Sequence, residues 1–449
     1  MLKSTDRCDN TLIMRYGTKI LTLAAILFTL SYRVYGQTED AHIGFSPYSL
    51  FGVGLLSDQG SANALSMGGI STGVRDVRYI NFLNPAAVTA RQQQSFMMDF
   101  SLNADNNFYS SNAADGVGHK SVNNVMNMRH IVMSFPIYHH SAFKFGIQQY
   151  SSTGYKFVTR ENEDALVSEA GDIKYMRSGQ GGIYQAFLGA GVTLIKVLNL
   201  GIDGQYYFGT INKYSNLVFN SSDAYKTVSS GWRYTPRGLS AKVGLQYEFI
   251  FKDQYSFVVG ATYQLKTRMH GDAERYAYSF IGSQQDTVKN TVKDLTTMDI
   301  PAEMSVGFSV RNAENWLAGF DYTRSDWRSN SFEATPGINA ALSLSEKFQT
   351  GFELTPDRYD VRYFFKRVTY RFGAYYDKSY LTIGGHQITS EGITLGFSIP
   401  VFRYYNAISL GFDFGRRGTL EDNLVKENYF KINLSFNLHD IWFIKSLYQ

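Results

Sequence analysis

The sequence predicts an all-β protein: a transmembrane antiparallel β-barrel of about fourteen strands, with an N-terminal segment plugging the lumen. Three observations predict this fold. Blocks of about ten residues alternate between apolar and polar side chains, and the links between these blocks alternate between short and long. An apolar segment without alternation precedes the first block. The aromatic content of 15%, with 32 Tyr and 33 Phe in 449 residues, agrees with a protein that exposes side chains to lipid.

The alternation is clear in three segments, SFMMDFSLNA (95–104), LSAKVGLQYEF (239–249) and FKINLSFNL (430–438). In each of them one face is apolar and the other carries Asp, Glu, Lys, Asn, Gln, Ser or Gly. Successive side chains of a strand point to opposite faces, so one face suits hydrocarbon and the other suits water. A soluble β-sandwich also alternates, so alternation alone leaves both fold classes open.

The lengths of the links favour the barrel. Short turns are expected after the second, fourth, sixth and eighth strands, at YHHS, KVLN, FKDQ and NAEN, and long polar segments such as 268–300 and 326–346 follow the odd strands. Short turns at one end and long loops at the other are typical of outer-membrane barrels. An even strand count requires 367–385 to be one strand rather than a hairpin at Asp377-Lys378. We expect strands near 95–104, 128–137, 142–151, 182–195, 200–211, 237–250, 255–267, 301–311, 316–325, 347–355, 367–385, 392–400, 406–415 and 428–438.

Tyrosines and tryptophans near the expected strand ends suit the aromatic girdles that barrels place at the two membrane interfaces. The alternative is that they form the core of a soluble β protein. The residues in question are Tyr150, Trp232, Tyr234, Trp316, Trp327, Tyr404 and Trp442.

The N-terminus predicts export. Residues 14–36 have a basic start, an apolar core too short to span a membrane and small residues before a cleavage site, which are the parts of a signal peptide. We therefore expect a signal peptide within 1–36, with Met14 as the initiator and the mature chain beginning at Gln37. The only cysteine, Cys8, precedes this signal, so we expect no disulfide, reactive thiolate or lipid-anchored cysteine in the mature protein.

Residues 37–92 consist of short apolar runs separated by glycines. Such a segment is too short for a core of its own and would expose apolar side chains in water, so we expect it to fill the barrel lumen as a hatch. Pro85 lacks a backbone donor and restricts Asn84, which suits an irregular plug that does not pair as a strand. The predicted organisation is then a hatch at 37–92, a barrel at 93–440 and a C-terminal tail at 441–449.

The chain resembles the FadL family of outer-membrane transporters, and in particular the FadL-like barrels of Bacteroidetes. The resemblance covers nearly the whole mature chain and lies in SPYSLFGVG, SMGG, INFLNPAA and the ending LSFNLHDIWFIK. It implies that the N-terminal segment is a hatch inside the barrel. The matching hatch residues are Gly68 and Gly69 of the MGG segment and the tripeptide Asn84, Pro85 and Ala86. Gln449 departs from the usual aromatic ending of such barrels.

No catalytic constellation stands out, so we expect no enzyme and no cofactor. Gly52-Val53-Gly54 lacks the lysine and helix of a phosphate loop, and His139-His140 is a solvated turn rather than a metal site. The net charge of +4 is spread along the chain and gives no reason to expect nucleic acid as a partner.

Charged residues of both signs are expected on the lumen face. Two interpretations stay open: an ion-pair network that holds the hatch, with Arg75, Asp76 and Arg78 as its hatch partners, or a polar permeation path. The lumen charges that we expect to hold the hatch are Asp99, Lys144, Lys242, Glu248, Arg371, Asp413 and Lys431, and strand parity also places Lys266, Glu303, Arg311 and Asp321 inward.

Two functions are compatible with these features. The first is a FadL-like channel of the outer membrane for passive uptake of hydrophobic small molecules. The second is a barrel that transports nothing and serves as a subunit of a larger outer-membrane machine for secretion, barrel assembly or surface-protein handling. The expected surroundings are the lipid bilayer and lipopolysaccharide, with a hydrophobic ligand in the first case and other outer-membrane proteins in the second.

Overall fold

The computed structural model describes residues 44–91, 95–112, 118–138, 140–160, 173–195, 197–219, 227–252, 254–281, 284–330, 339–401 and 406–441. The predicted signal peptide with Met14 and Cys8, the mature start at Gln37, His139, Tyr404, Trp442 and the tail beyond Ile441 lie outside these ranges. By their contacts, the residues from 42 onward form one compact unit.

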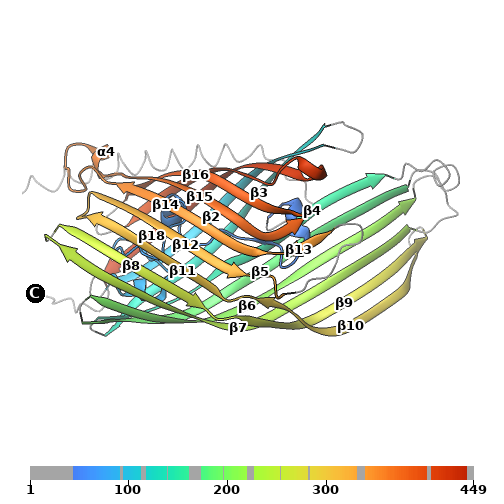
Figure 1. The fold of residues 1–449 in the computed structure, drawn as a ribbon, viewed down its shortest axis with the longest axis horizontal. Helices are drawn as coiled ribbons and strands as arrows, with labels where there is room; N and C mark the ends of the chain where they lie inside the picture. The colour runs from blue at the N-terminus through green and yellow to red at the C-terminus, as the bar shows by residue number, and fades with distance from the viewer. Residues whose placement is uncertain are drawn as a thin grey trace, which may run out of the picture. The chain divides into compact units, whose positions relative to one another are not determined.

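The chain folds into a closed antiparallel barrel of fourteen strands, as the sequence predicts (Figure 1). Three of these strands are interrupted and carry two labels each: β8 with β9, β10 with β11, and β13 with β14. The ring closes where β18 pairs with β2, from Val425 opposite Ser111 to Ile441 opposite Ser95. The strands are β2 (Ser95–Asn112), β3 (Gly118–Tyr138), β4 (Ser141–Arg160), β5 (Ile173–Leu194), β6 (Leu198–Phe219), β7 (Thr227–Phe251), β8 (Tyr255–Gln264), β9 (Thr267–Ile281), β10 (Gln284–Ile300), β11 (Glu303–Asn312), β12 (Trp316–Asp326), β13 (Ala340–Leu342), β14 (Leu344–Leu354), β15 (Thr369–Ile383), β16 (His386–Pro400), β17 (Ala407–Arg417) and β18 (Val425–Ile441).

The connections follow the predicted alternation at one end of the barrel. Short turns join β3 to β4, β5 to β6, β7 to β8 and β11 to β12, at the four positions expected from the sequence. The predicted even count also holds, because β15 runs through Asp377-Lys378 without a turn. The hairpin that follows lies at Gly384-Gly385, so β16 begins at His386 rather than at residue 392.

The prediction of long loops at the other end was wrong for several connections. Residues 268–300, expected to be a loop, instead form most of β9 and β10, which pair with each other as an extended hairpin. These strands run past the shorter ones at one end of the barrel in Figure 1. A strand that extends beyond the membrane meets water on both faces and need not alternate, so its sequence looks like a polar loop.

The two faces of the wall differ as parity requires. On β7 the apolar Leu239 and Val243 are 77% and 46% exposed on the outside, whereas Lys242 and Gln246 are buried inside. The girdle prediction was wrong for Tyr150, Tyr234 and Trp327, which are buried. Tyr150 and Trp327 instead pack with the hatch, as described next.

Residues 44–91 contact inward-facing side chains of strands around the ring. Tyr48, Leu50, Phe51 and Val53 join a buried apolar cluster that includes Tyr150 and Trp327, and Phe82 packs against Phe187 in a second cluster. In Figure 1 this blue segment lies among the barrel strands. Its regular elements are short: η2 (Pro47–Leu50), β1 (Leu55–Leu56), α2 (Ala62–Leu65) and η3 (Pro85–Thr89).

Candidate functional site

The tripeptide Asn84-Pro85-Ala86 begins the short helix η3 rather than a strand. The Asn84 side chain is fully buried and caps the helix, because its Oδ1 accepts a hydrogen bond from the Ala86 amide at 3.0 Å. Its Nδ2 donates to the Thr72 carbonyl at 2.8 Å. Pro85 occupies the first helical position, where the missing N–H leaves no bond unmade. The tripeptide thus ties two parts of the hatch together.

Glycines in the barrel wall form the seat of this turn. A β-carbon placed on Gly201 of β6 would lie 2.5 Å from the Ala86 nitrogen, and one placed on Gly244 of β7 would lie 2.7 Å from the Pro85 ring. The backbone of the hatch therefore lies directly on the backbone of the wall, which only glycine permits. Other inward glycines lie in the same way against hatch residues 62–73, and we call the whole set the glycine seat. Its members are Gly191, Gly201, Gly244, Gly260, Gly319, Gly351, Gly373, Gly396 and Gly411.

Gly68 and Gly69 of the MGG segment contact the opposite part of the wall. Both have positive φ angles, +69° and +92°, which glycine adopts without strain. The Gly68 amide donates to Thr394 Oγ1 and its carbonyl accepts from Gln349 Nε2, both at 2.9 Å. A β-carbon on Gly68 would lie 2.6 Å from the Ala374 carbonyl oxygen, so this position also requires close backbone approach.

Five of the predicted lumen charges form hydrogen bonds or ion pairs with the hatch: Lys144, Glu248, Lys431, Arg311 and Asp321. Asp321 accepts bonds from the Ser71 and Thr72 amides at 2.6 and 2.7 Å. The Lys144 ammonium is completely buried and donates to the Phe82 carbonyl at 2.6 Å, while pairing with Asp203 at 2.9 Å. Glu248 pairs with Arg75 at 2.9 Å, and Lys431 pairs with Asp58 at 2.7 Å. Lys347 pairs with Asp58 from the other side at 3.2 Å.

Asp58 is the anion that these two lysines share. Burial alone would raise its pKa, but the ammonium groups of Lys431 and Lys347 hold the pKa of Asp58 well below its usual range. The backbone carbonyl of the same residue also accepts a bond from Arg129. The residue is therefore ionised and held by groups from three strands.

A second buried network fixes the hatch near Arg78. Asp76 pairs with Arg78 at 2.5 Å and with Arg311 of β11 at 2.6 Å. Glu353 of β14 pairs with Arg78 and, at 2.8 Å, with Arg371 of β15. All five side chains are at most 15% exposed. Such pairs are costly to break, because removing one partner leaves a buried charge.

The other predicted lumen charges bind within the wall. Asp99 pairs with His130 at 2.9 Å, Lys242 lies 3.7 Å from Glu303, and Asp413 accepts a bond from the Tyr375 hydroxyl at 2.9 Å. Arg371 reaches the hatch through Glu353, through Ser398, which donates to Asn63, and through its cation-π contact with Tyr79.

Sequence reasoning missed Asp58, Lys347, Glu353 and the glycine seat. Asp58 lies in a segment without periodicity, so parity gave no signal there. Glu353 and Lys347 lie on β14, and the alternation in KFQTGFE (347–353) does indicate that both side chains point inward. The glycine seat also had a signal, since glycines recur in mid-strand at inward positions.

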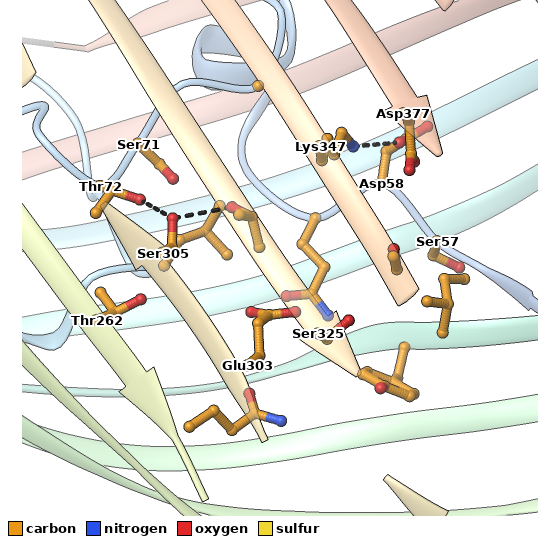
Figure 2. Close-up of a pocket in the computed structure, with 18 of the residues that line it drawn as sticks. Ser57, Asp58, Ser71, Thr72, Thr262, Glu303, Ser305, Ser325, Lys347 and Asp377 are labelled. Carbon is orange, nitrogen blue, oxygen red and sulfur yellow. Dashed lines mark hydrogen bonds and ion pairs between the residues drawn. The ribbon is translucent and has the colours of Figure 1, made fainter. Parts of the chain in front are cut away.

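One cavity lies beside the hatch. It has a volume of about 150 Å³ and is lined by hydroxyl, amide and charged groups, several of which are labelled in Figure 2. Figure 2 shows Thr72 joined to Ser305, and Lys347 joined to Asp58, across this cavity. Apolar side chains complete its wall: Leu56, Leu83, Tyr150, Ile300, Pro301 and Trp327.

The described residues contain no group of three or more His, Cys, Asp or Glu placed to hold a metal ion. In the same part of the chain, no helix has the length and apolar character needed to cross a membrane.

The fold is that of FadL-type transporters. It resembles the toluene transporter TodX of Pseudomonas putida, with 15% identity and a TM-score of 0.57 over 86% of this chain and 100% of that one. The toluene transporter TbuX of Ralstonia pickettii gives 15% identity and a TM-score of 0.56 over 85% and 98%. A FadL homologue of Pseudomonas aeruginosa gives 12% identity and 0.55 over 87% and 100%. These proteins are transporters or their homologues rather than enzymes.

The structural likeness confirms the predicted FadL-like fold, and identities this low support the fold alone. No curated protein matches the sequence. The family model described as BamG matches residues 18–449. Because this match spans nearly the whole sequence, the chain belongs to the BamG family.

Proposed function

We propose that this protein is a non-transporting barrel of the outer membrane that serves as a subunit of a larger outer-membrane machine. The observation that supports the proposal is the set of buried contacts between residues 44–91 and the barrel wall. Buried contacts hold residues 44–91 against strands around the barrel, and the cavity beside them measures about 150 Å³. A barrel filled in this way offers its lipid-facing wall and the surfaces at its two ends for contact with other proteins.

The energetics of opening support this proposal. A path through the lumen requires the hatch to leave its seat, which separates Glu353 from Arg78 and Lys144 from the Phe82 carbonyl. Losing one partner of a buried ion pair costs about 3–5 kcal/mol. A free-energy difference of about 5.5 kcal/mol is enough to move a two-state equilibrium from 1:99 to 99:1. Several such contacts would therefore keep an open state rare without a further source of energy.

The comparisons are compatible with this role. Membership of the BamG family leaves a machine subunit open, and the likeness to toluene transporters concerns the fold. The mixed signs of the lumen charges favour mutual pairing over selection of a permeating ion. On this proposal residues 37–92 act as a permanent plug, the barrel spans about 93–440, and export follows the signal peptide predicted at 1–36.

Passive uptake of a hydrophobic compound is the second candidate. One observation favours it: the apolar part of the main cavity, with Ile300 and Trp327, lies beside the interruption of the wall at Pro301-Ala302. The volume of about 150 Å³ is small for such a ligand, since drug-sized pockets measure about 300–1,000 Å³. The polar and charged groups on the rest of the lining would also lose contact with water and gain no partner from an apolar ligand.

Extraction of the intact protein in a mild detergent separates the two candidates. For a machine subunit we expect a defined partner at constant stoichiometry across size exclusion, with a total mass above that of the barrel and its detergent. A solitary barrel that carries a hydrophobic compound, identified by mass spectrometry after denaturation, would contradict the subunit role and support uptake.

A further inference from the structure

The connection between β14 and β15 differs from its neighbours. Residues 355–368 form the longest connection at the end of the barrel where the short turns lie, and they include the short helix α4 (Phe364–Arg367). In barrels of this arrangement, the end with short turns faces the periplasm. Figure 1 shows α4 at the end opposite to the extended β9–β10 hairpin. We call residues 355–368 the α4 loop.

Internal bonds give the α4 loop a defined shape. The Asp357 amide donates to the Lys366 carbonyl at 3.0 Å and closes the loop at its base. Asp360 accepts bonds from the amides of Arg362 and Tyr363 at 2.7 and 2.6 Å, and it pairs with the Lys366 ammonium at 2.9 Å. The Asp360 carboxylate is thus directed inward, into the loop itself.

Apolar side chains of the same loop point into solvent. Val361 is 98% exposed and Phe365 is 75% exposed, and Val361 is the most exposed large apolar residue among those described. Tyr359, Tyr363 and Phe364 are also exposed. Clustered apolar exposure on an ordered surface marks an interaction site more often than an accident of packing.

A small arginine-lined cavity adjoins the loop. It measures about 40 Å³, and the loop arginines Arg358 and Arg367 line it together with Arg78 and Arg371. Arg78 and Arg371 share Glu353, Arg78 also pairs with Asp76, and Arg358 lies 3.7 Å from Glu314, so three acids face four arginines. The buried Nε of Arg367 has no hydrogen-bond partner in the part of the chain that the structure describes. The cavity therefore has an excess of positive charge and an unused donor.

We propose that the α4 loop and this arginine cavity form a docking site for a segment of a periplasmic protein that presents a carboxylate flanked by apolar side chains. The carboxylate pairs with Arg367, for which the planar guanidinium offers a bidentate geometry. The flanking side chains cover Val361 and Phe365. This inference rests on the proposed function and adds to it the place and chemistry of one partner contact.

The position of the cavity favours a protein over the membrane as the occupant. Its lining includes the hatch residues Asn63 and Tyr79, so the base of the loop lies at the mouth of the lumen rather than on the lipid-facing belt. The charges also fit a carboxylate, because the arginines that line the cavity outnumber the acids that pair with them.

Peptide binding to the purified full-length protein tests the chemistry. The probes are dye-labelled ten-residue peptides with a central Glu-Asp between Leu and Phe residues, and matched peptides with Gln-Asn. We expect the acidic peptides to bind about tenfold or more tightly than the amide peptides, and Arg367→Gln to remove that difference. Val361→Ser with Phe365→Ser should weaken both sets. The control Ile195→Ser, which changes an 85% exposed side chain in another turn, should change neither. Equal affinity for both sets, or no binding of either, overturns the proposal.

Two further measurements separate this proposal from the alternatives. A dye on Val361→Cys should not be quenched by brominated lipid in reconstituted vesicles, and quenching would place the loop in the membrane and refute a protein docking site. In native extraction, the variant with Val361→Ser, Phe365→Ser and Arg367→Gln should lose the partner that wild type retains. If both retain it, the docking site is wrong and the subunit role stands. If wild type has no partner, the proposed function fails.

Discussion

Replacing Gly201 by alanine is the sharpest perturbation of the hatch seat. The added β-carbon would lie 2.5 Å from the Ala86 nitrogen and would overlap Pro85, and these are backbone atoms that cannot rotate away. Ordinary van der Waals contacts begin near 3.4 Å, so the hatch has to shift by nearly an ångström. Overpacking of this kind costs about 1–3 kcal/mol, which lowers the ratio of seated to unseated hatch about 5- to 140-fold.

The matched control is Gly204→Ala on the same strand. Gly204 points outward, and its added β-carbon would meet only the Leu188 carbonyl oxygen at 3.8 Å. Both variants change strand propensity equally, so only the contact with the hatch differs. We expect Gly201→Ala to insert normally, as judged by heat-modifiable gel mobility, and to show frequent openings in planar bilayers, while Gly204→Ala stays closed. Equal closure of the two variants would refute the close contact of hatch and wall.

Three further predictions concern the charges and the wall. Glu353→Gln leaves two buried arginines without their shared carboxylate and should increase bilayer openings at least tenfold, whereas Glu274→Gln in an exposed pair should not. Val243→Lys puts an ammonium into lipid and should lower the folded fraction on heat-modifiable gels by an amount that corresponds to about 2–4 kcal/mol. Thr262→Lys points into the main cavity, whose lining includes Glu303, and should fold; equal loss would contradict the assignment of faces. Because the folded pKa of Asp58 is depressed, its contribution is present above the unfolded pKa of about 3.9 and is lost only as the pH falls through the lower folded value. Conductance should therefore be the same at pH 5 and pH 7.5, and openings that appear at pH 5 would show that another group controls the hatch.

The structure changes the effect that we expect from one substitution. Gly244→Lys faces the lumen, and strand parity alone would make it a mild substitution. The Pro85 ring lies 2.7 Å from the position of its β-carbon, so we now expect this substitution to displace the hatch. Parity indicates which face a residue occupies and does not indicate what lies opposite.

The wall of the barrel could be predicted because lipid imposes a period of two on every membrane-spanning strand. Strand number and the positions of the short turns follow from that period and from β15 passing through Asp377-Lys378. The extensions of β9 and β10 could not be found in this way, since both faces lie in water. The buried position of Trp327 was missed because an aromatic residue near a strand end suits a girdle and a hatch contact equally well.

The site was harder to predict than the wall because its contacts join an irregular segment to a regular one. Lys144 and Lys431 were found from the parity of their strands, but their partners, the Phe82 carbonyl and Asp58, lie where no periodicity operates. The role of Asn84 as a helix cap was likewise hidden, although Asn before Pro is a known signal for the start of a helix. A backbone carbonyl carries no sequence signal at all.

Uptake by whole cells tests the sealed lumen most directly. Three strains of a host whose outer membrane contains lipopolysaccharide are compared: one without the barrel, one with the wild-type protein, and one with the variant Thr72→Cys plus Ser305→Cys. The uptake of a labelled toluene-sized compound is measured in each strain. The two hydroxyls lie 2.7 Å apart across hatch and wall, and the predicted mature chain has no other cysteine to interfere with this cross-link. We predict the same initial uptake rate in all three strains, before and after reduction of the cross-link. Faster uptake with wild type, abolished by the cross-link and restored by its reduction, would contradict the account and make the protein a gated channel.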